Sequence, residues 1–198
     1  MRQMREAAGA ARRRRHPETE LNPLRQGLRL DRIPDPCAFV LFGATGDLAH
    51  RKVVPAIYQL LRTNLLPAEF SLVAVARRPY TDEAFAAELR TSVEEYSRVQ
   101  PIDETAWAEL AKRITYQQLD FAEDAGYDRL GERLDALDAE RGTAGNRLYY
   151  LATQPSAVTE IVRQMGRVGL DHEQHGTGWR RSPRRTRRGS RPRWIRPP

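Results

Sequence analysis

Two glycines and an alanine at regular spacing suggest a phosphate-binding turn. Gly43, Gly46 and Ala49 follow an unbroken apolar run, residues 37–42, and open a segment with helical periodicity. Such a run is typical of a buried parallel strand, and glycines let the backbone turn tightly and approach a phosphate. The following helix N-terminus offers free N–H donors and about half a positive charge. The pattern predicts a dinucleotide diphosphate site, with a purely structural turn as the alternative.

Alternating strands and helices are predicted to position this turn. Further strands are expected at residues 71–76, 114–121 and 147–152, and helices at 48–61, 82–96, 104–113, 127–139 and 157–168. Thr81 can cap the second helix, and Pro55 can kink the first. The predicted fold class is α/β, a Rossmann-like doubly wound parallel sheet with ligands at the carboxyl ends of its strands.

The two ends of the chain differ in composition from its middle. Residues 1–35 show no sustained periodicity and are predicted to be a disordered arm, and residues 36–170 are predicted to fold. Residues 171–198 form an Arg/Pro/Gly-rich tail that is also predicted to be disordered. Nine of the 33 basic residues are arginines in 176–198, which contains no acidic residue, so the net charge of +7 belongs to the tail.

The end of the second predicted strand indicates which dinucleotide would bind. A carboxylate at that position would favour NAD by hydrogen bonding to a ribose hydroxyl, but this strand ends in Arg77 and Arg78. A guanidinium presents planar donors that match a phosphate, so the strand end favours the 2′-phosphate of NADP. The alternative is that both arginines only solvate a loop.

Three segments together resemble one known family. They are the glycine segment from Gly43 to Lys52 with Pro55 after it, the strand end Val75-Ala76-Arg77, and the strand from Asn146 to Ala152. In this order they are similar to the N-terminal, NADP-binding domain of glucose-6-phosphate dehydrogenase, over residues 37–170. The resemblance implies oxidation of glucose 6-phosphate to 6-phosphogluconolactone, in the pentose phosphate pathway, by the whole enzyme.

The resemblance also implies a set of cofactor-binding residues. The residues implied to line the NADP phosphates are Gly43, Ala44, Thr45, Gly46, Asp47, Leu48, Ala49 and His50. Arg77 is implied to bind the 2′-phosphate, and Asp120 and Phe121 to lie beside the cofactor. The family usually has Lys or Arg where His50 stands, which changes one phosphate contact.

The family motifs that carry catalysis do not occur in these 198 residues. The E-K-P-F-G segment, the R-I-D-H-Y-L-G-K-E segment and the histidine base after it are missing, as is the second, α+β domain. We therefore assign no catalytic residue and expect NADP binding without sugar oxidation. A reading-frame shift near residue 170 is one hypothesis for the change in composition.

Other function classes have weaker support. The arginine tail, with Trp179 and Trp194 available for stacking, could bind nucleic acid nonspecifically. His172 and His175 lie three apart but lack further ligands, so no metal site is assigned. A Tyr-x-x-x-Lys pair for short-chain dehydrogenase chemistry and a Gly-Lys-Ser/Thr P-loop are both missing.

The cell compartment and the partners follow from what the sequence contains. A single cysteine, Cys37, suits a reducing compartment, and no apolar run approaches the roughly 18 residues of a membrane span. We therefore expect a cytoplasmic protein without a membrane contact. Its expected partners are NADP and, by the resemblance, glucose 6-phosphate, and a homo-oligomer is possible.

Overall fold

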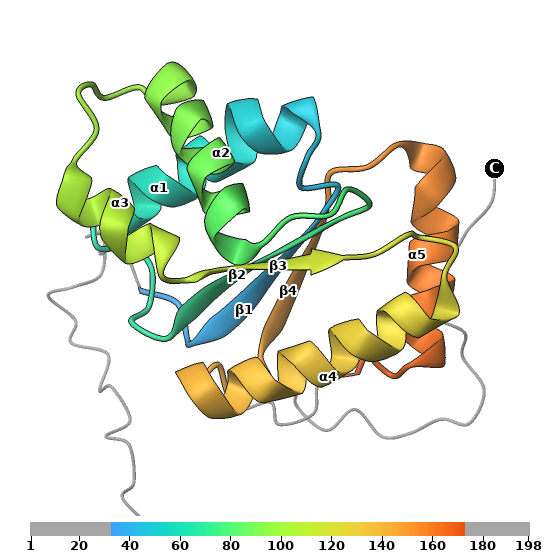
Figure 1. Cartoon of the computed structure of the whole chain (residues 1–198). Helices are drawn as coiled ribbons and strands as arrows, with labels where there is room; N and C mark the ends of the chain where they lie inside the picture. The colour runs from blue at the N-terminus through green and yellow to red at the C-terminus, as the bar shows by residue number, and fades with distance from the viewer. Residues whose placement is uncertain (1–32, 173–198) are drawn as a thin grey trace, which may run out of the picture. The chain divides into compact units, whose positions relative to one another are not determined.

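The computed structural model describes residues 33–172, which form a parallel sheet between two layers of helices (Figure 1). The strands are β1 (Cys37–Phe42), β2 (Phe70–Ala76), β3 (Ile114–Gln118) and β4 (Arg147–Leu151). The helices are η2 (Ala49–Val53), α1 (Val54–Arg62), α2 (Asp82–Tyr96), α3 (Glu104–Ala111), α4 (Asp124–Arg141) and α5 (Pro155–Arg167). The arm and the tail predicted at the two ends lie almost entirely outside the described residues.

The sheet has the strand order β3-β2-β1-β4, and all three pairings are parallel. Helices α1, α2 and α3 lie on one face, and α4 and α5 lie on the other (Figure 1). Every residue of β2 is buried, and all but Ser71 are apolar, because helices cover a central strand on both faces. The predicted doubly wound α/β fold is therefore confirmed.

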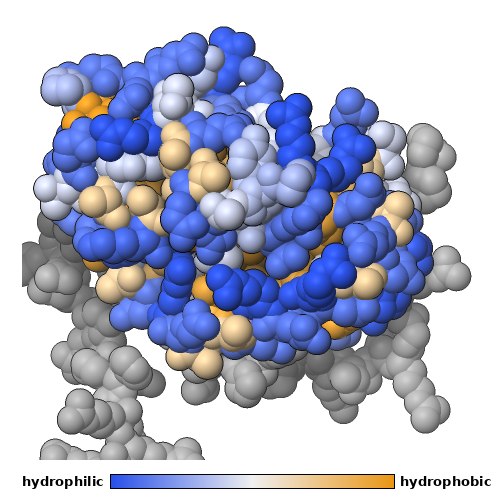
Figure 2. All heavy atoms as spheres, in the orientation of Figure 1, coloured by the Kyte–Doolittle hydropathy of each residue, from blue (hydrophilic) through white to orange (hydrophobic). Residues whose placement is uncertain are grey.

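Each face of the sheet has its own hydrophobic core. On one face, Tyr58 of α1, Phe85 of α2 and Leu110 of α3 are fully buried against the strands. On the other, Tyr127 and Leu134 of α4 pack with the side chains that β1 and β2 turn toward them. Charged and polar side chains cover most of the surface in view (Figure 2).

The helix predicted over residues 48–61 is divided into two pieces. Residues Ala49–Val53 form one turn of π-helix, η2, and α1 begins at Val54 with Pro55 in its first turn. Proline has no N–H to donate to the carbonyl of the residue four positions earlier, and in a regular α-helix its ring would clash with that carbonyl. A wider turn directly before Pro55 accommodates the ring, so the expected kink takes the form of a π segment.

The remaining elements agree with the predicted ones to within a few residues. Helix α2 begins as expected, with the Thr81 hydroxyl accepting from the Ala84 amide at 3.2 Å. Strand β3 ends at Gln118, three residues before the predicted end. No helix among residues 33–172 is both long and apolar enough to cross a membrane.

Candidate nucleotide-binding site

The glycine turn follows β1 at the carboxyl edge of the sheet, as predicted. Gly43 has a φ of 77°, a conformation that residues with a side chain rarely adopt. A Cβ atom there would lie 2.4 Å from the carbonyl oxygen of Ala152, in the segment after β4. At Gly46 a Cβ would lie 3.0 Å from the Gly43 carbonyl oxygen. Gly43 is therefore needed both for the backbone conformation and for the close approach of the neighbouring strand end.

The turn leaves several backbone amides available to an anion. The amides of Gly43 and Ala44 donate to the Val75 carbonyl at 2.9 and 3.2 Å, and the Gly46 amide donates to Gly43 at 2.9 Å. The first helical hydrogen bond runs from the His50 amide to the Gly46 carbonyl. The amides of Asp47 and Leu48 come before His50 and therefore have no acceptor within the helix. Such amides at a helix start are an anion-binding arrangement.

The strand order places the turn at a switch point of the sheet. The chain leaves β1 toward the helices on one face, whereas α4 and α5, the helices before and after β4, lie on the other face. Ligands of doubly wound sheets bind in the crevice where the strand order reverses. Here Gly43 packs closely against the segment after β4, and the buried Thr153 hydroxyl of that segment has no hydrogen-bond partner among residues 33–172. Thr153 was not predicted as a site residue.

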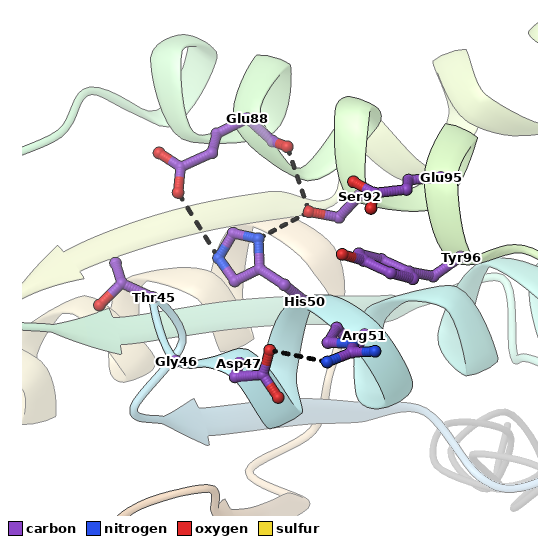
Figure 3. Close-up of a pocket in the computed structure, with 9 residues that line it drawn as sticks. All are labelled: Thr45, Gly46, Asp47, His50, Arg51, Glu88, Ser92, Glu95 and Tyr96. Atoms are coloured by element: carbon purple, nitrogen blue, oxygen red, sulfur yellow. Dashed lines mark hydrogen bonds and ion pairs between the residues drawn. The ribbon is translucent and has the colours of Figure 1, made fainter.

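An open pocket of about 290 Å³ lies between the glycine turn and α2 (Figure 3). Its lining residues are Thr45, Gly46, Asp47, His50, Arg51, Glu88, Ser92, Glu95 and Tyr96. The four residues from α2 were missed in the sequence analysis, because their amphipathic spacing only indicates a helix packed on a core. Glu88, Ser92, Glu95 and Tyr96 become pocket residues only when α2 packs beside η2.

The His50 side chain points to α2 (Figure 3). Its Nδ1 lies 2.6 Å from the Ser92 hydroxyl oxygen, and its Nε2 lies 3.5 Å from a Glu88 carboxylate oxygen. The imidazole is mostly buried, with 16% of the side chain exposed. The neighbouring Glu88 carboxylate also raises the pKa of Tyr80. His50 thus lies in the pocket but is held by α2.

Asp47 and Arg51 form the outer side of the pocket. Arg51 Nη1 lies 3.6 Å from the Asp47 carboxylate, and its guanidinium carbon lies 5.3 Å from the ring centre of Tyr96. More than half of each charged side chain is exposed, so the pair contributes little to stability. The pair instead keeps a guanidinium near the helix start.

Arg77 lies where the sequence predicted it, directly after β2 at the same edge as the glycine turn. Both Arg77 and Arg78 are exposed, and neither forms an ion pair within residues 33–172. Their carbonyl groups accept hydrogen bonds from Gln118 Nε2 at 3.2 Å and the Tyr116 hydroxyl at 2.5 Å. The backbone is therefore held by β3, and the exposed Arg77 guanidinium has no ion-pair partner among residues 33–172.

Asp120 and Phe121 follow β3 at this edge, and their side chains differ in exposure. The Asp120 carboxylate is exposed and accepts from the Ala122 amide at 3.1 Å. The Phe121 ring packs against Phe42 with ring centres 6.1 Å apart, on the face covered by α4. The Asp120 carboxylate is exposed at the edge, whereas the Phe121 side chain is partly buried and packs against the core.

The described residues contain no cluster of three or more His, Cys, Asp or Glu side chains that could hold a metal ion. His172 is exposed and faces Asp171 at 3.7 Å. His175, its proposed companion in the sequence, lies outside the described residues.

A parallel sheet in this order, with a glycine turn and free helix-start amides at the switch point, defines a Rossmann-type dinucleotide-binding domain. The family model for "Glucose-6-phosphate dehydrogenase, NAD binding domain" matches residues 40–182. The chain therefore belongs to the glucose-6-phosphate dehydrogenase family. The match continues beyond residue 170, where the sequence analysis ends the folded domain.

Individual relatives agree with this assignment. The chain is 42% identical over 141 residues to glucose-6-phosphate 1-dehydrogenase of Chlamydia muridarum, covering 71% of this chain and 28% of the relative. It is 41% identical over 162 residues to glucose-6-phosphate 1-dehydrogenase 2 of Mycobacterium tuberculosis H37Rv, covering 81% and 31%. The chain thus spans less than a third of the length of these relatives.

A solved structure from the same family has the same fold. The crystal structure of glucose-6-phosphate 1-dehydrogenase from Mycobacterium avium superimposes with a TM-score of 0.60 and 26% identity. The superposition covers 71% of this chain and 28% of that one. The Rossmann-like core is therefore the part that the two share.

Proposed function

We propose that this chain is the coenzyme-binding domain of a glucose-6-phosphate dehydrogenase and that it binds NADP at the carboxyl edge of its sheet. The observation that carries the proposal is the glycine turn, whose free helix-start amides lie at the switch point. The exposed, unpaired Arg77 on the adjacent strand supports the choice of NADP over NAD. Family membership supports glucose 6-phosphate as the substrate of the complete enzyme.

Each part of the edge has a distinct role in this proposal. The amides of Asp47 and Leu48 hold the diphosphate, and Gly43 lets the backbone come close to it. Arg77 binds the 2′-phosphate through charge-assisted hydrogen bonds. Bound at these residues, NADP would supply the hydride acceptor for oxidation of the sugar at C1 to the lactone. These residues position the coenzyme and do not transfer protons.

Two further statements belong to the proposal. The free, partly buried thiol of Cys37 is compatible with a reducing compartment such as the cytoplasm. Family membership supports a role of the complete enzyme in the pentose phosphate pathway. The 198-residue polypeptide by itself is expected to bind NADP without oxidising glucose 6-phosphate, since the sequence motifs that hold the sugar and the base do not occur in it.

The test is a comparison of NADP and NAD binding by calorimetry to the full chain and to Arg77→Ala. A net loss of about 1.5–3 kcal/mol is usual for a hydrogen bond to a charged group, which corresponds to a roughly 10- to 150-fold loss of NADP affinity. NAD affinity should be unchanged, because NAD lacks the 2′-phosphate. Arg113→Ala, on the amino side of β3, is the matched control. An equal loss for both coenzymes would contradict the role of Arg77, and no binding of either would refute the proposed function.

A further inference from the structure

The segment that presents Arg77 has no regular secondary structure. It comprises residues 77–81, which join β2 to α2, and its first three residues are exposed. An arginine on such a segment loses backbone and side-chain freedom when it binds a phosphate, and this loss reduces the affinity. A segment already held in its binding conformation avoids part of the loss. The residues that hold it can therefore affect coenzyme affinity without contacting the coenzyme.

Two side chains of β3 bond to the backbone of this segment. Gln118 Nε2 donates to the Arg77 carbonyl oxygen at 3.2 Å, and the Tyr116 hydroxyl donates to the Arg78 carbonyl oxygen at 2.5 Å. The strand register pairs Gln118 with Ala76, the residue directly before Arg77. Residues two apart on a strand project to the same face of the sheet, which here is the face covered by α2. Alternate residues of β3 thus hold two consecutive carbonyl groups.

Tyr116 also holds the far end of the segment. Its amide donates to the carboxylate of Asp82, in the first turn of α2, at 2.6 Å. Its ring packs against the ring of Tyr80 with centres 5.4 Å apart, and Tyr80 packs in turn against Phe85 at 5.5 Å. Only 8% of Tyr116 is exposed, so little water competes for these bonds. One residue of β3 therefore joins the two ends of the segment, at Arg78 and at Asp82.

We propose that Tyr116 and Gln118 are positioning residues that hold Arg77 ready for the 2′-phosphate and thereby raise the preference of this chain for NADP over NAD. The inference rests on the proposed function, because it concerns the same coenzyme site. Through the two carbonyl groups, these side chains fix the backbone from which the guanidinium extends. NAD has no 2′-phosphate for this guanidinium to bind. Loss of the positioning should therefore lower NADP affinity alone.

The double variant Tyr116→Phe with Gln118→Met removes both hydrogen-bond donors and nearly keeps the size of each side chain. Calorimetry on the full chain should show NADP affinity falling roughly tenfold, as for the loss of one or two hydrogen bonds, with NAD affinity unchanged. Tyr58→Phe is the matched control, since it removes a buried hydroxyl that accepts from the Asp103 amide at 2.7 Å, outside this segment. Unchanged NADP affinity in the double variant, or an equal loss for NAD, would overturn the inference.

A chain that lacks the Arg77 guanidinium shows whether the two residues act through it. In an Arg77→Ala background, the double substitution should cause no further loss of NADP affinity, because residues that act through one group are not additive. A further tenfold loss would show that Tyr116 and Gln118 act by another route, and would exclude a positioning role. If the unsubstituted chain binds neither coenzyme, the proposed function fails and the inference fails with it. Selective NADP binding that the double substitution leaves intact refutes the inference alone.

Limited digestion with trypsin measures the positioning without any coenzyme. Trypsin cleaves after arginine but not before proline, so Arg77-Arg78 is the bond of this segment that it can cut, and Arg78-Pro79 is not. Mass spectrometry should show this cut appearing faster in the double variant than in the unsubstituted chain or in Tyr58→Phe. Thermal unfolding by circular dichroism shows whether the three chains fold alike. Equal cleavage rates in folded chains would show that the two side chains do not hold the segment, which contradicts the inference.

Discussion

His50 and Ser92 join the helix of the glycine turn to α2 through one hydrogen bond of 2.6 Å between side chains 42 residues apart. The bond holds the imidazole at the base of the pocket, with Glu88 on its other side. The imidazole is therefore turned toward α2, and neither lysine nor arginine stands at this position beside the phosphate-binding turn (Figure 3).

Replacing His50 by lysine should strengthen NADP binding. An ammonium group supplies a charge that does not depend on pH near neutrality, and one charge-assisted hydrogen bond to phosphate contributes about 1.5 kcal/mol, or roughly tenfold in affinity. Calorimetry on His50→Lys measures the change. Leu60→Lys, at the far end of α1, adds the same charge away from the turn and should leave affinity unchanged. Equal gains in both variants would indicate a long-range charge effect only.

Three glycine-to-alanine substitutions separate backbone strain from steric contact. Gly131 in α4 has nothing within 4 Å of an added Cβ, so alanine should stabilise the helix by about 0.5–1 kcal/mol. Gly169 also has open space but a φ of 73°, so alanine adds strain alone. At Gly43 both penalties apply, since the Cβ would lie 2.4 Å from a carbonyl oxygen.

The free energies of unfolding, measured in urea, should therefore fall in the order Gly131→Ala, Gly169→Ala, Gly43→Ala. NADP affinity should fall in Gly43→Ala and stay unchanged in the other two. If Gly43→Ala is no less stable than Gly169→Ala, the close approach of Ala152 does not restrict this position.

Two arginines with equally short ion pairs should differ strongly in their contribution to stability. Arg147 to Asp135 and Arg163 to Glu160 are both 2.5 Å, but the arginine side chains are 6% and 58% exposed. Removing one partner of a buried pair usually costs about 3–5 kcal/mol, and an exposed pair contributes less than about 1 kcal/mol. Urea unfolding of Arg147→Ala and Arg163→Ala measures both. Similar losses would show that burial does not govern these pairs.

Stability should decrease at high pH through two buried phenols. Burial raises the pKa of Tyr116 and of Tyr127 to about 12, from an ordinary value of about 10. Because the unfolded chain then releases these protons at lower pH than the folded chain, the stabilisation is complete below pH 10 and is lost as the pH rises to 12. Tyr116→Phe with Tyr127→Phe should flatten this decrease in circular dichroism, and an unchanged slope would assign it to other groups.

The amino-acid sequence by itself determined the elements and their order, because each depends on local patterns. The apolar run at 37–42 predicts a buried strand, Thr81 predicts the start of α2, and Gly43 predicts a turn next to a ligand. Family motifs likewise point to Arg77, which the structure places at the same edge as the glycine turn.

Only the tertiary structure decided which side chains meet. The bond from His50 to Ser92, the pocket residues on α2 and the approach of Ala152 to Gly43 join segments tens of residues apart. Helical spacing predicts that α2 packs on a core but does not specify the neighbour of each polar residue. Phe121 shows the same limit, since no local pattern specifies that its ring packs on Phe42, the last residue of β1. Contacts of this kind depend on how helices pack across a sheet, a global property that no local pattern contains.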